Sequence, residues 1–401
     1  MQHSFPLCIS AYTAVSAAGH GRTALAASLR ERRSGLTRND FTSTPLATWI
    51  GRVPALESRA LPAQFSEWEC RNNRLAWLGL TSDGFLDSVL RAKGRYGAGR
   101  IAIVIGTSTS SIGATEDAYA RLQDDGLYPP DLRRPIVHTP HSLGDFVVRA
   151  LGLTSLCVTV ATACSSSAKV FAQAARLISL GLADAAVVGG VDTLCGSVLF
   201  GFNSLALVSP DPCRPFDVQR KGISLGEAAG FALLEPPDSA AAGDRVCILG
   251  AGESSDAYHM SSPHPQGAGA QQAIVAALDS AGLEPDAIDY INLHGTASEK
   301  NDAVEAQVIA RLFPASTRAS STKGWTGHTL GAAGILEAVI SILAIEQSLA
   351  PGTLNTSRPD PVCGPQITLH NTPGRIRYAE SHSFGFGGSN CVLVFGRRRD
   401  A

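Results

Sequence analysis

The sequence predicts an α/β protein made of two similar halves. Runs of β-branched and small apolar residues alternate with stretches whose apolar residues recur at helical spacing, a pattern typical of βαβ units. The order of these segments in the first half recurs in the second, and 40 glycines among 401 residues supply tight turns between them. With 44% hydrophobic and 17% charged residues, a chain of this length can bury the core of one large two-part domain.

The first half contains the clearest elements. Apolar runs predict strands at 7–12, 100–106, 157–161, 185–189 and 230–234. Helical spacing predicts helices at 21–32 and 66–92, and a further helix after the strand at 157–161. Proline, serine and glycine gather in 236–244, so we expect the chain to divide there into residues 1–240 and 241–401.

The second half repeats this order at low sequence identity. The matching segments are 245–257 with 6–18, 288–307 with 101–119, 321–345 with 158–178, and 389–396 with 229–235. We therefore expect two βαβ-rich halves that pack together, with the loops after their strands meeting between them.

Composition and charge exclude several classes of protein. The formal net charge of -2 provides no overall basic field, so nucleic acid is not an expected partner. The N-terminal segment lacks a basic region followed by a sustained apolar run, and no run of about 18 apolar residues occurs. Neither a signal peptide nor a membrane-spanning helix is expected. The nine cysteines are odd in number, widely spaced and without a CxxC pair, which predicts no disulfide framework, no metal site and a reducing, cytoplasmic location.

The segment 156–181 carries the first candidate functional residue. A β-rich run at 157–161 predicts a buried strand, and Cys164 follows it in a tight turn before a helix. The three serines after Cys164 can cap the first turn of that helix. Cys164 would then lie at the positive end of the helix dipole, where the pKa of the thiol falls below its free value of about 8.5. Most cysteines are inert core residues, so this turn alone does not establish a nucleophile.

Two histidines lie in matching loops of the second half. His294 ends a predicted strand and begins the loop HGTAS, and His328 lies in the glycine- and alanine-rich segment TGHTLGAAG. A lone histidine is more often a structural polar group, but both loops are expected to converge on Cys164. A cysteine with two histidines suits acyl transfer, because a thiolate forms a thioester and two N–H donors stabilise an enolate oxygen. The loop SFGFGGSN adds backbone N–H groups around Phe386 that can form an oxyanion hole.

Five motifs occur in the order seen in a known family. They are TACSSS around Cys164, DAYHMSSP (256–263), HGTASEKND (294–302), STKGWTGHTLGAAG (321–334) and SFGFGGSN (383–390). Together they closely resemble the elongating β-ketoacyl-acyl carrier protein synthases of the condensing-enzyme, or thiolase, superfamily, over essentially the whole chain. The resemblance implies the thiolase fold, in which two similar halves form a five-layered αβαβα core. The half 1–240 would carry the nucleophilic cysteine, and the half 241–401 the two histidines.

The resemblance also implies a role for each matching residue. Cys164 would take an acyl group from acyl carrier protein, while His294 and His328 would assist malonyl decarboxylation and hold the enolate oxygen. The carbanion would then attack the Cys164 thioester, giving β-ketoacyl carrier protein and CO2. Lys323, with its partner Glu337, would order the site. The N–H groups of Cys164 and Phe386 would form an oxyanion hole, and the Phe386 side chain would form a gate. Thr296 and Ser298 would bind the pantetheine arm.

Partners follow from the same resemblance. Substrates would arrive on the phosphopantetheine of acyl carrier protein, so no separate cofactor is expected. Carrier proteins are acidic, and the residues expected to dock one are Arg71, Arg74, Arg133 and Arg134. The family normally forms dimers, so we expect a homodimer, with a heterodimer that includes a chain-length partner as the alternative.

Several features depart from the family pattern. Ser298 replaces a usual threonine and keeps the hydroxyl. Trp325 replaces a smaller residue, and we expect it to reshape the surroundings of His328. His382 replaces a common asparagine, and we expect it to have a structural role. Together with a short segment at 208–213, these differences favour a specialised aryl polyene or polyketide pathway over fatty-acid synthesis.

Other functions stay open on the sequence alone. A coenzyme A-using thiolase would carry a second cysteine in the loop that here holds His328, and an initiating synthase would carry asparagine there. A non-catalytic chain-length partner would resemble this chain but lack Cys164. All three patterns therefore fit the residues less well than the pattern of an elongating synthase does.

Overall fold

The computed structural model describes residues 5–237 and 245–397, and its centre is one 11-stranded mixed sheet. Across the sheet the strands follow in the order β12 (Arg318–Ser320), β11 (Tyr290–Asn292), β15 (Tyr378–Gly385), β16 (Ser389–Arg397), β10 (Val246–Ser255), β1 (Leu7–Ser16), β9 (Ala228–Glu235), β7 (Ala185–Asp192), β5 (Ile101–Gly106) and β6 (Cys157–Val160), with β2 (Gly19–His20) beside β1. All five strands predicted in the first half are present.

The strand order confirms the two similar halves. From the seam between β1 and β10, the first half runs outward as β1, β9, β7, β5 and β6, and the second as β10, β16, β15, β11 and β12. Strands β1 and β10 pair through Leu7 with Ile248 and Cys8 with Cys247, so the seam is narrow. The expected boundary falls in 238–244, outside the described residues, and the division at residue 240 stays a prediction.

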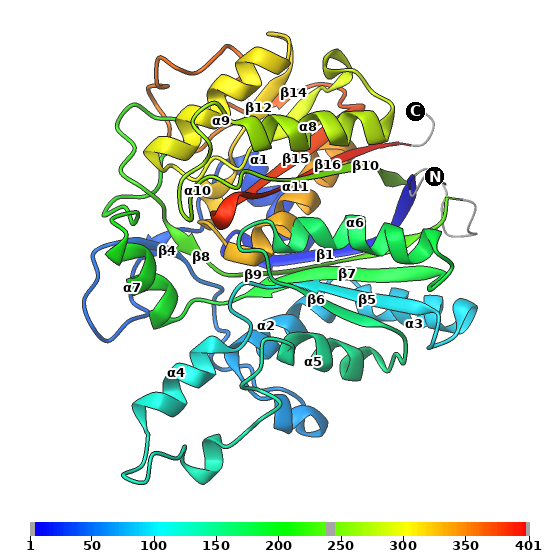
Figure 1. Cartoon of the computed structure of the whole chain (residues 1–401), viewed down its shortest axis with the longest axis vertical. Coiled ribbons are helices and arrows are strands. Elements are labelled where there is room, and N and C mark those ends of the chain that lie inside the picture. Colours follow the sequence, from blue (N-terminus) through cyan, green and yellow to red (C-terminus); the bar gives the residue numbers. More distant parts are fainter. Residues whose placement is uncertain (1–4, 238–244, 398–401) are drawn as a thin grey trace.

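Helices complete five layers, in which each half of the sheet forms a layer of its own; Figure 1 shows them from top to bottom as helices, half-sheet, helices, half-sheet and helices. The layers contain α8 (Ala268–Ala281) and α9 (Glu299–Leu312) outside the second half, α6 (Ser166–Ser179) and α11 (Ala333–Gln347) in the middle, and α2 (Arg71–Leu80), α3 (Phe85–Tyr96) and α5 (Ser142–Leu151) outside the first half. The αβαβα core implied by the resemblance is confirmed.

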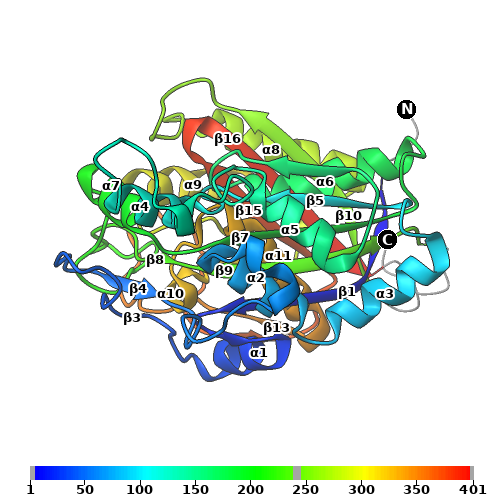
Figure 2. The same ribbon diagram turned by 90° about the horizontal axis from the view of Figure 1, so that it is seen from below.

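The remaining elements surround this core. They are α1 (Arg22–Glu31), α4 (Ile112–Ala120), α7 (Gly196–Ser204), α10 (Lys323–Thr326), the 3-10 turns η1 (Ala63–Trp68), η2 (Pro130–Leu132), η3 (Pro285–Ala287), η4 (Leu330–Ala332) and η5 (Phe386–Gly388), and the short strands β3 (Thr37–Arg38), β4 (Trp49–Gly51), β8 (Leu225–Gly226), β13 (Leu349–Ala350) and β14 (Thr372–Pro373). Helices α4 and α7 lie side by side at one end of the molecule (Figures 1 and 2). The helix predicted at 66–92 is two helices, because the chain turns through Gly84 in a left-handed conformation.

Helix α11 of the middle layer is buried on all sides over most of its length. Every residue of α11 from Ala333 to Ile345 is buried, including Glu337 and Ser341, which interrupt the apolar run in the sequence. The helical stretch Leu330–Gln347 is long and apolar enough to cross a membrane, but 89% of it is buried inside the structure. A helix that is hydrophobic all round and covered by protein is a core helix.

Close backbone packing fixes α6 against the first half-sheet. Strands β5 and β7 are buried along their whole lengths, as expected for strands covered on both faces. A Cβ on Gly106, at the end of β5, would lie 2.4 Å from the backbone nitrogen of Ser167. Glycine therefore lets the first turn of α6, which follows Cys164, sit directly on the end of β5.

Strand β6 differs from its expected environment. The sequence predicts a buried strand, yet all four residues from Cys157 to Val160 are half-buried, because β6 is the outermost strand of the sheet. Its apolar sequence resembles that of a central strand, so composition alone does not reveal an edge position.

A disulfide bond corrects the expectation drawn from cysteine spacing. Cys8 on β1 and Cys247 on β10 are register partners on adjacent antiparallel strands and are bonded to each other, with Cα atoms 4.0 Å apart. They are 239 residues apart in the sequence, so no local pattern indicates the pair. The other cysteines are free thiols: Cys70, Cys157, Cys164, Cys195, Cys213, Cys363 and Cys391.

Candidate active site

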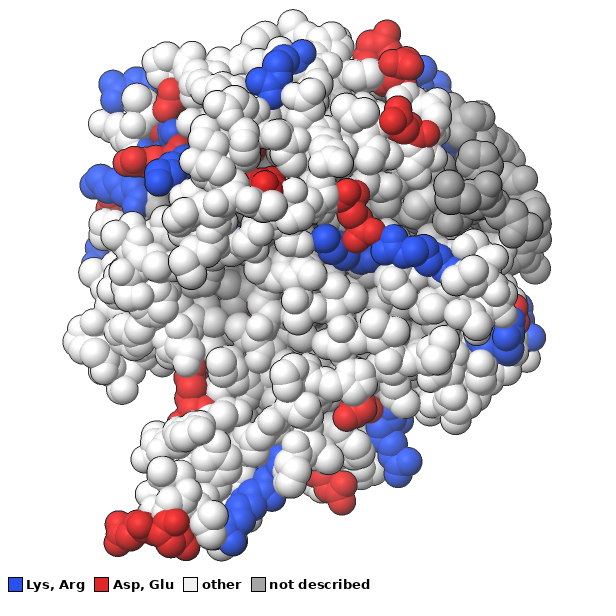
Figure 3. Space-filling view, in the orientation of Figure 1, with Lys and Arg blue, Asp and Glu red and all other residues white. Residues whose placement is uncertain are grey.

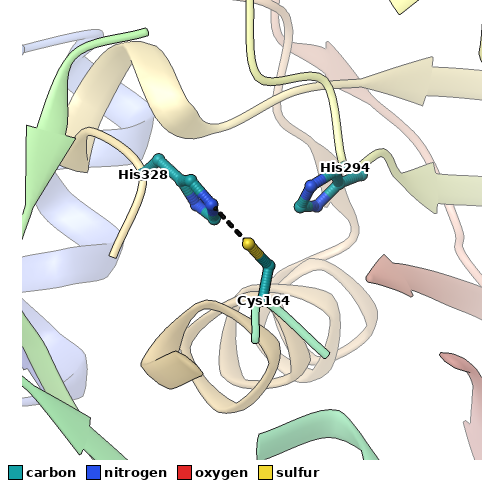
Figure 4. Close-up of side chains that lie close together, drawn as sticks. All are labelled: Cys164, His294 and His328. Carbon is teal, nitrogen blue, oxygen red and sulfur yellow. Dashed lines mark hydrogen bonds between the residues drawn. The ribbon is translucent and has the colours of Figure 1, made fainter. Parts of the chain in front are cut away.

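Three loops meet beside the middle layer. Cys164 lies in the turn between β6 and α6, His294 follows β11, and His328 lies between α10 and η4. The three residues are only 5%, 2% and 2% exposed. The imidazoles of His294 and His328 point toward the Cys164 sulfur from two sides (Figure 4). The structure therefore brings together the three residues that the sequence singled out.

The sulfur and the two imidazoles lie within reach of one another. His328 Nε2 is 3.0 Å from Cys164 Sγ (Figure 4). The sulfur and one nitrogen of each histidine all lie within 4.8 Å of one another. The rings of His294 and His328 are nearly perpendicular, at 88°, with centroids 5.4 Å apart. A proton can pass between Sγ and His328, and an oxygen placed between the rings can contact both.

Each of these loops contains a non-glycine residue in a left-handed conformation. The φ angles are 53° at Ala163, 69° at Ala297 and 57° at Leu330. Residues with a Cβ adopt such angles at an energetic cost, and they persist where the surrounding structure holds them. The sharp turns next to the three reactive side chains are therefore imposed by the packing of the two halves.

The serines after Cys164 stabilise the turn and not the helix end. Ser165 occupies the N-cap position of α6, but its side chain makes no cap hydrogen bond. Instead Ser165 Oγ donates to the Thr162 carbonyl at 2.9 Å, and Ser166 Oγ accepts the Thr162 N–H at 2.9 Å. Ser167 Oγ accepts the N–H of Ile335 on α11 at 2.9 Å. The expected capping is thus replaced by bonds that close the turn and join α6 to α11.

The pKa of Cys164 moves opposite to the sequence-based expectation. Burial raises the pKa of Cys164 to about 11 and outweighs the backbone N–H of Phe386 and the ammonium of Lys323, which both lower it. The thiol is therefore protonated at neutral pH. His328, with Nε2 at 3.0 Å, is the group positioned to take that proton.

Both histidines are neutral at neutral pH. Burial, followed by the charge of Lys323, lowers the pKa of His294 and of His328 well below the usual value of 6.5. A neutral imidazole has one N–H donor and one acceptor nitrogen. Each ring can therefore accept the thiol proton or donate a hydrogen bond to an oxygen.

Charged side chains hold the backbone of His294 from both sides. Glu305 on α9 accepts the N–H groups of His294 and Gly295 at 2.8 and 2.7 Å. Lys323 Nζ donates to the His294 carbonyl at 2.5 Å and forms an ion pair with Glu337, whose pKa burial raises to about 7. Sequence reasoning identified Lys323 and Glu337 but missed Glu305, because nothing in its local pattern separates it from a surface carboxylate on a helix.

A cavity of about 380 Å³ contains the reactive groups. Its wall includes Cys164, His294 and His328, together with the hydroxyl residues Thr296 and Ser298. Thr296 Oγ1 and Ser298 Oγ lie 2.9 Å apart. A cavity whose wall carries paired hydroxyls and a thiol can accept an extended polar arm that carries a thioester.

Phe386 lies on the wall of the same cavity, in the glycine-rich turn η5. Its backbone N–H faces the Cys164 sulfur and lowers the pKa of that thiol. Its ring stacks on Phe202 of α7, with centroids 5.5 Å apart. A Cβ on Gly385 would lie 3.2 Å from the Cys164 nitrogen, so glycine permits this close approach. The aromatic partner Phe202 comes from the first half, and sequence analysis did not link it to Phe386.

Family models match both halves of the chain. The model described as "Beta-ketoacyl synthase, N-terminal domain" matches residues 74–240, and "Beta-ketoacyl synthase, C-terminal domain" matches residues 246–357. Nodulation protein E of Rhizobium meliloti (strain 1021) is 36% identical over 305 residues, which cover 74% of this chain and 75% of the relative. The chain belongs to the β-ketoacyl synthase family.

Further comparisons place this β-ketoacyl synthase among condensing acyltransferases of the thiolase fold. The 3-oxoacyl-[acyl-carrier-protein] synthase 2 of Staphylococcus aureus (strain COL) is 36% identical over 315 residues, covering 74% of this chain and 75% of the relative. A solved ketosynthase in complex with its chain length factor, from Xenorhabdus doucetiae, matches with a TM-score of 0.90, 36% identity and 99% of both chains. A β-ketoacyl synthase from Burkholderia phymatum matches with a TM-score of 0.87, 28% identity, and 98% of this chain and 99% of that one.

The arginines expected to dock a carrier protein differ in their surroundings. Arg71 forms ion pairs with Glu57 and with the buried Glu227, so its charge is balanced within the synthase fold. The others contact neighbours as follows: Arg74 pairs with Glu69, Arg134 donates to the Glu69 carbonyl, and Arg133 donates to the Tyr128 carbonyl and to Gln123. On the face shown in Figure 3, basic and acidic side chains are interspersed. The docking role stays a prediction, and Arg133 is the most exposed of the four.

Trp325 does not line the cavity that contains His328. Its ring is fully buried, and its indole N–H donates to the carbonyl of Ser28 on α1 at 3.0 Å. The guanidinium of Arg32 lies 5.9 Å from the ring centroid. In this synthase the large side chain therefore anchors α10 to α1, which explains how a bulky residue fits three positions before His328.

The reactive cluster also contains residue types that bind zinc. The donor atoms of Cys164, His294 and His328 are close enough to hold a metal ion. The ammonium of Lys323, whose charge lowers the pKa of both histidines, opposes the binding of a further cation. Because the same charge favours a thiolate, the environment suits acyl transfer better than metal binding.

Proposed function

We propose that this β-ketoacyl synthase uses Cys164 as its nucleophile in a decarboxylative Claisen condensation of an acyl group with malonyl-acyl carrier protein. The observation that carries the proposal is the position of Sγ and two neutral imidazoles, within 4.8 Å of one another, on the wall of one cavity. Covalent catalysis of this kind needs no separate cofactor, and that expectation stays a prediction.

In the first half-reaction, His328 accepts the thiol proton and the sulfur attacks the thioester carbonyl of the acyl carrier protein. The backbone N–H groups of Cys164 and Phe386 stabilise the oxyanion. A carbon–sulfur bond to Cys164 forms, the bond to the pantetheine sulfur breaks, and the proton passes to the released pantetheine thiol.

In the second half-reaction, the malonyl group loses CO2, and the electron pair of the broken carbon–carbon bond becomes an enolate. The enolate oxygen is held by an N–H of His294 and by the N–H of His328 in the tautomer that carries its proton on Nε2, since both imidazoles are neutral. The carbanion attacks the thioester carbonyl and expels the Cys164 thiolate, which takes a proton from solvent. The products are β-ketoacyl-acyl carrier protein, CO2 and the free thiol.

The arm and its carrier protein use the rest of the cavity. We assign the pantetheine hydroxyl contacts to Thr296 and Ser298, and the gate between arm and acyl group to Phe386, which Phe202 supports by stacking. Docking is proposed to rest mainly on Arg133 and Arg134, because ion pairs already engage Arg71 and Arg74.

The partner subunit is proposed to pair with the outer edge of β6. A half-buried edge strand exposes unpaired backbone groups, and natural proteins usually cover such an edge. The solved relative from Xenorhabdus doucetiae is a ketosynthase in complex with its chain length factor and matches 99% of this chain. That match favours a heterodimer in a specialised polyene or polyketide pathway over a homodimer in fatty-acid synthesis. A free Cys164 thiol fits the proposed cytoplasmic location, whereas the Cys8–Cys247 disulfide is of a kind that is rare in a reducing compartment.

Intact-mass spectrometry tests the nucleophile. Purified wild type and Cys164→Ala are incubated with a panel of acyl carrier protein thioesters. We expect the mass of the wild type to rise by one acyl group and that of the variant to stay unchanged, and the preferred acyl group indicates the pathway. Cys70→Ala is the matched control, because Cys70 is also buried with its pKa raised to about 11. Acylation of Cys164→Ala would contradict the assignment.

A further inference from the structure

A second cluster of buried charges lies behind the His294 loop. His382 on β15 is fully buried, and its Nε2 lies 2.9 Å from Glu380 Oε2. Its Nδ1 lies 3.5 Å from Glu305 Oε1 on α9, an ion-pair contact. Residues two apart on a strand point to the same face, so His382 and Glu380 face this cluster together. One imidazole therefore lies between two buried carboxylates.

Glu305 connects the cluster to the active site. Its carboxylate oxygens accept the N–H groups of His294 and Gly295, and Lys323 holds the His294 carbonyl from the other side. A shift of the Glu305 carboxylate would therefore shift the backbone that carries the His294 ring. Phe384 packs between the two histidines, with ring centroids 5.3 Å from His382 and 6.1 Å from His294.

The contacts with the two carboxylates set the charge of His382. Burial lowers the pKa of His382, but its contacts with Glu305 and Glu380 outweigh burial and raise the pKa to about 9. Burial raises the pKa of Glu380, and the hydrogen bond with His382 acts against that rise. At neutral pH the ring is an imidazolium. Loss of its proton would leave two buried carboxylates facing a neutral ring.

The other titratable groups around His382 belong to the catalytic assembly. The charge of His382 lowers the pKa of His294, after the larger effects of burial and of Lys323. It also lowers the pKa of Glu337, which pairs with Lys323. The imidazolium thus acts on the site both through the Glu305 carboxylate and through its field.

We propose that His382 is a positioning residue, an imidazolium that holds the Glu305 carboxylate and through it fixes His294 for the decarboxylation half-reaction. The inference rests on the proposed function, and it adds a role where only structural support was expected from the sequence. Cys164 and His328 are carried by other loops, so acylation of Cys164 depends less on this cluster than decarboxylation does.

The test measures the two half-reactions separately in the wild type and in His382→Asn. We expect kcat for decarboxylation of malonyl-acyl carrier protein to fall about tenfold to a hundredfold, because a displaced catalytic ring loses most of its effect. The KM should stay unchanged, and the rate of Cys164 acylation should change less than about twofold. In the wild type, decarboxylation should also decline as the pH rises through about 9, where His382 loses its proton, and the variant should lack this decline.

Two further variants keep the test decisive. The double variant Glu380→Gln/His382→Asn removes the imidazolium without leaving Glu380 as an unpaired buried charge. This variant should fold and still lose decarboxylation. His370→Asn makes the same substitution at an exposed histidine and should match the wild type. Equal losses in both half-reactions, or an alkaline decline that persists without His382, would overturn the proposal.

A wild-type measurement and a control on the reaction complete the design. The imidazole of His382, followed by NMR in the wild type, should titrate near pH 9, and a pKa below 7 would overturn the proposal whatever the variants do. If the wild type itself shows neither acylation nor decarboxylation, the proposed function fails and not the role of His382.

Discussion

Lys323 is the residue on which the charge balance of the site depends. Its ammonium contacts the His294 carbonyl and Glu337, and its charge lowers the pKa of Cys164, His294 and His328. Its side chain is 2% exposed and that of Glu337 is 4% exposed, so each needs the other as a partner. A buried ion pair adds little net stability, but removing one member leaves an unpaired buried charge.

Replacing Lys323 by methionine should therefore lower the free energy of unfolding by about 3–5 kcal/mol and abolish condensation. Burial raises the pKa of Glu337 to about 7 even beside Lys323, and removal of the ammonium raises it further. At pH 6 Glu337 is mostly protonated in both proteins, whereas at pH 8 only the wild type gains from the ion pair, so the loss of stability should be larger at pH 8 than at pH 6. Denaturant unfolding at the two pH values measures this. Lys93→Met, on α3, serves as the control and should cost far less. A loss in Lys323→Met that is independent of pH would show that Glu337 does not carry the unpaired charge.

At the residue scale, the sequence predicts which residues form the site better than it predicts their burial and their partners. The motifs place Cys164, His294 and His328 together, because each motif follows a strand of a repeated unit. They do not show that Cys164 is buried, which reverses the expected direction of its pKa shift. Nor do they show that Arg71 pairs with Glu227, a contact between residues 156 positions apart.

At the scale of elements, the two ends of the sheet are unequal. Strand β12 is covered by the segment around Ile367. The Ala319 N–H donates to the Gln366 carbonyl, and the Ala319 carbonyl accepts the Thr368 N–H. Strand β6, the equivalent strand of the first half, has β5 on one side and stays half-buried. The sequence predicts both strands, but only the sheet order shows which edge is available to a partner.

The β6 edge can be blocked without disturbing its pairing with β5. The carbonyls of Leu156 and Val160 accept N–H groups from the β5 side, so alternation places the Thr159 N–H on the free edge. Thr159→Pro should therefore prevent dimer formation, whereas Thr159→Ala keeps the N–H and should preserve it. Light scattering separates one chain of 41.8 kDa from a dimer. A dimer that survives in Thr159→Pro would place the interface elsewhere, and a wild type that dimerises only with a chain-length partner would support the heterodimer.

At the scale of the whole molecule, the two halves share the middle layer of α6 and α11, and among the described residues they meet in the sheet along a short seam. Repeated segments in the sequence predict the halves and their five layers, because each half needs the other to cover its apolar face. They do not predict what joins the seam, since the pairing of Cys8 with Cys247 depends on the register of β1 against β10.

The disulfide at the seam can be tested by counting the thiols that react with an alkylating reagent. Alkylation in denaturant without reductant should modify seven of the nine cysteines, and all nine after reduction. Because the bond closes a loop of 239 residues, reduction should lower the free energy of unfolding by about 2–4 kcal/mol. Cys8→Ala is the control, because it leaves Cys247 without a disulfide partner. The variant should show eight alkylated thiols without reductant, and its free energy of unfolding should be the same with and without reductant. Nine thiols modified before reduction would show that the halves are held by the seam strands and the middle layer, with both cysteines free as their spacing first indicated.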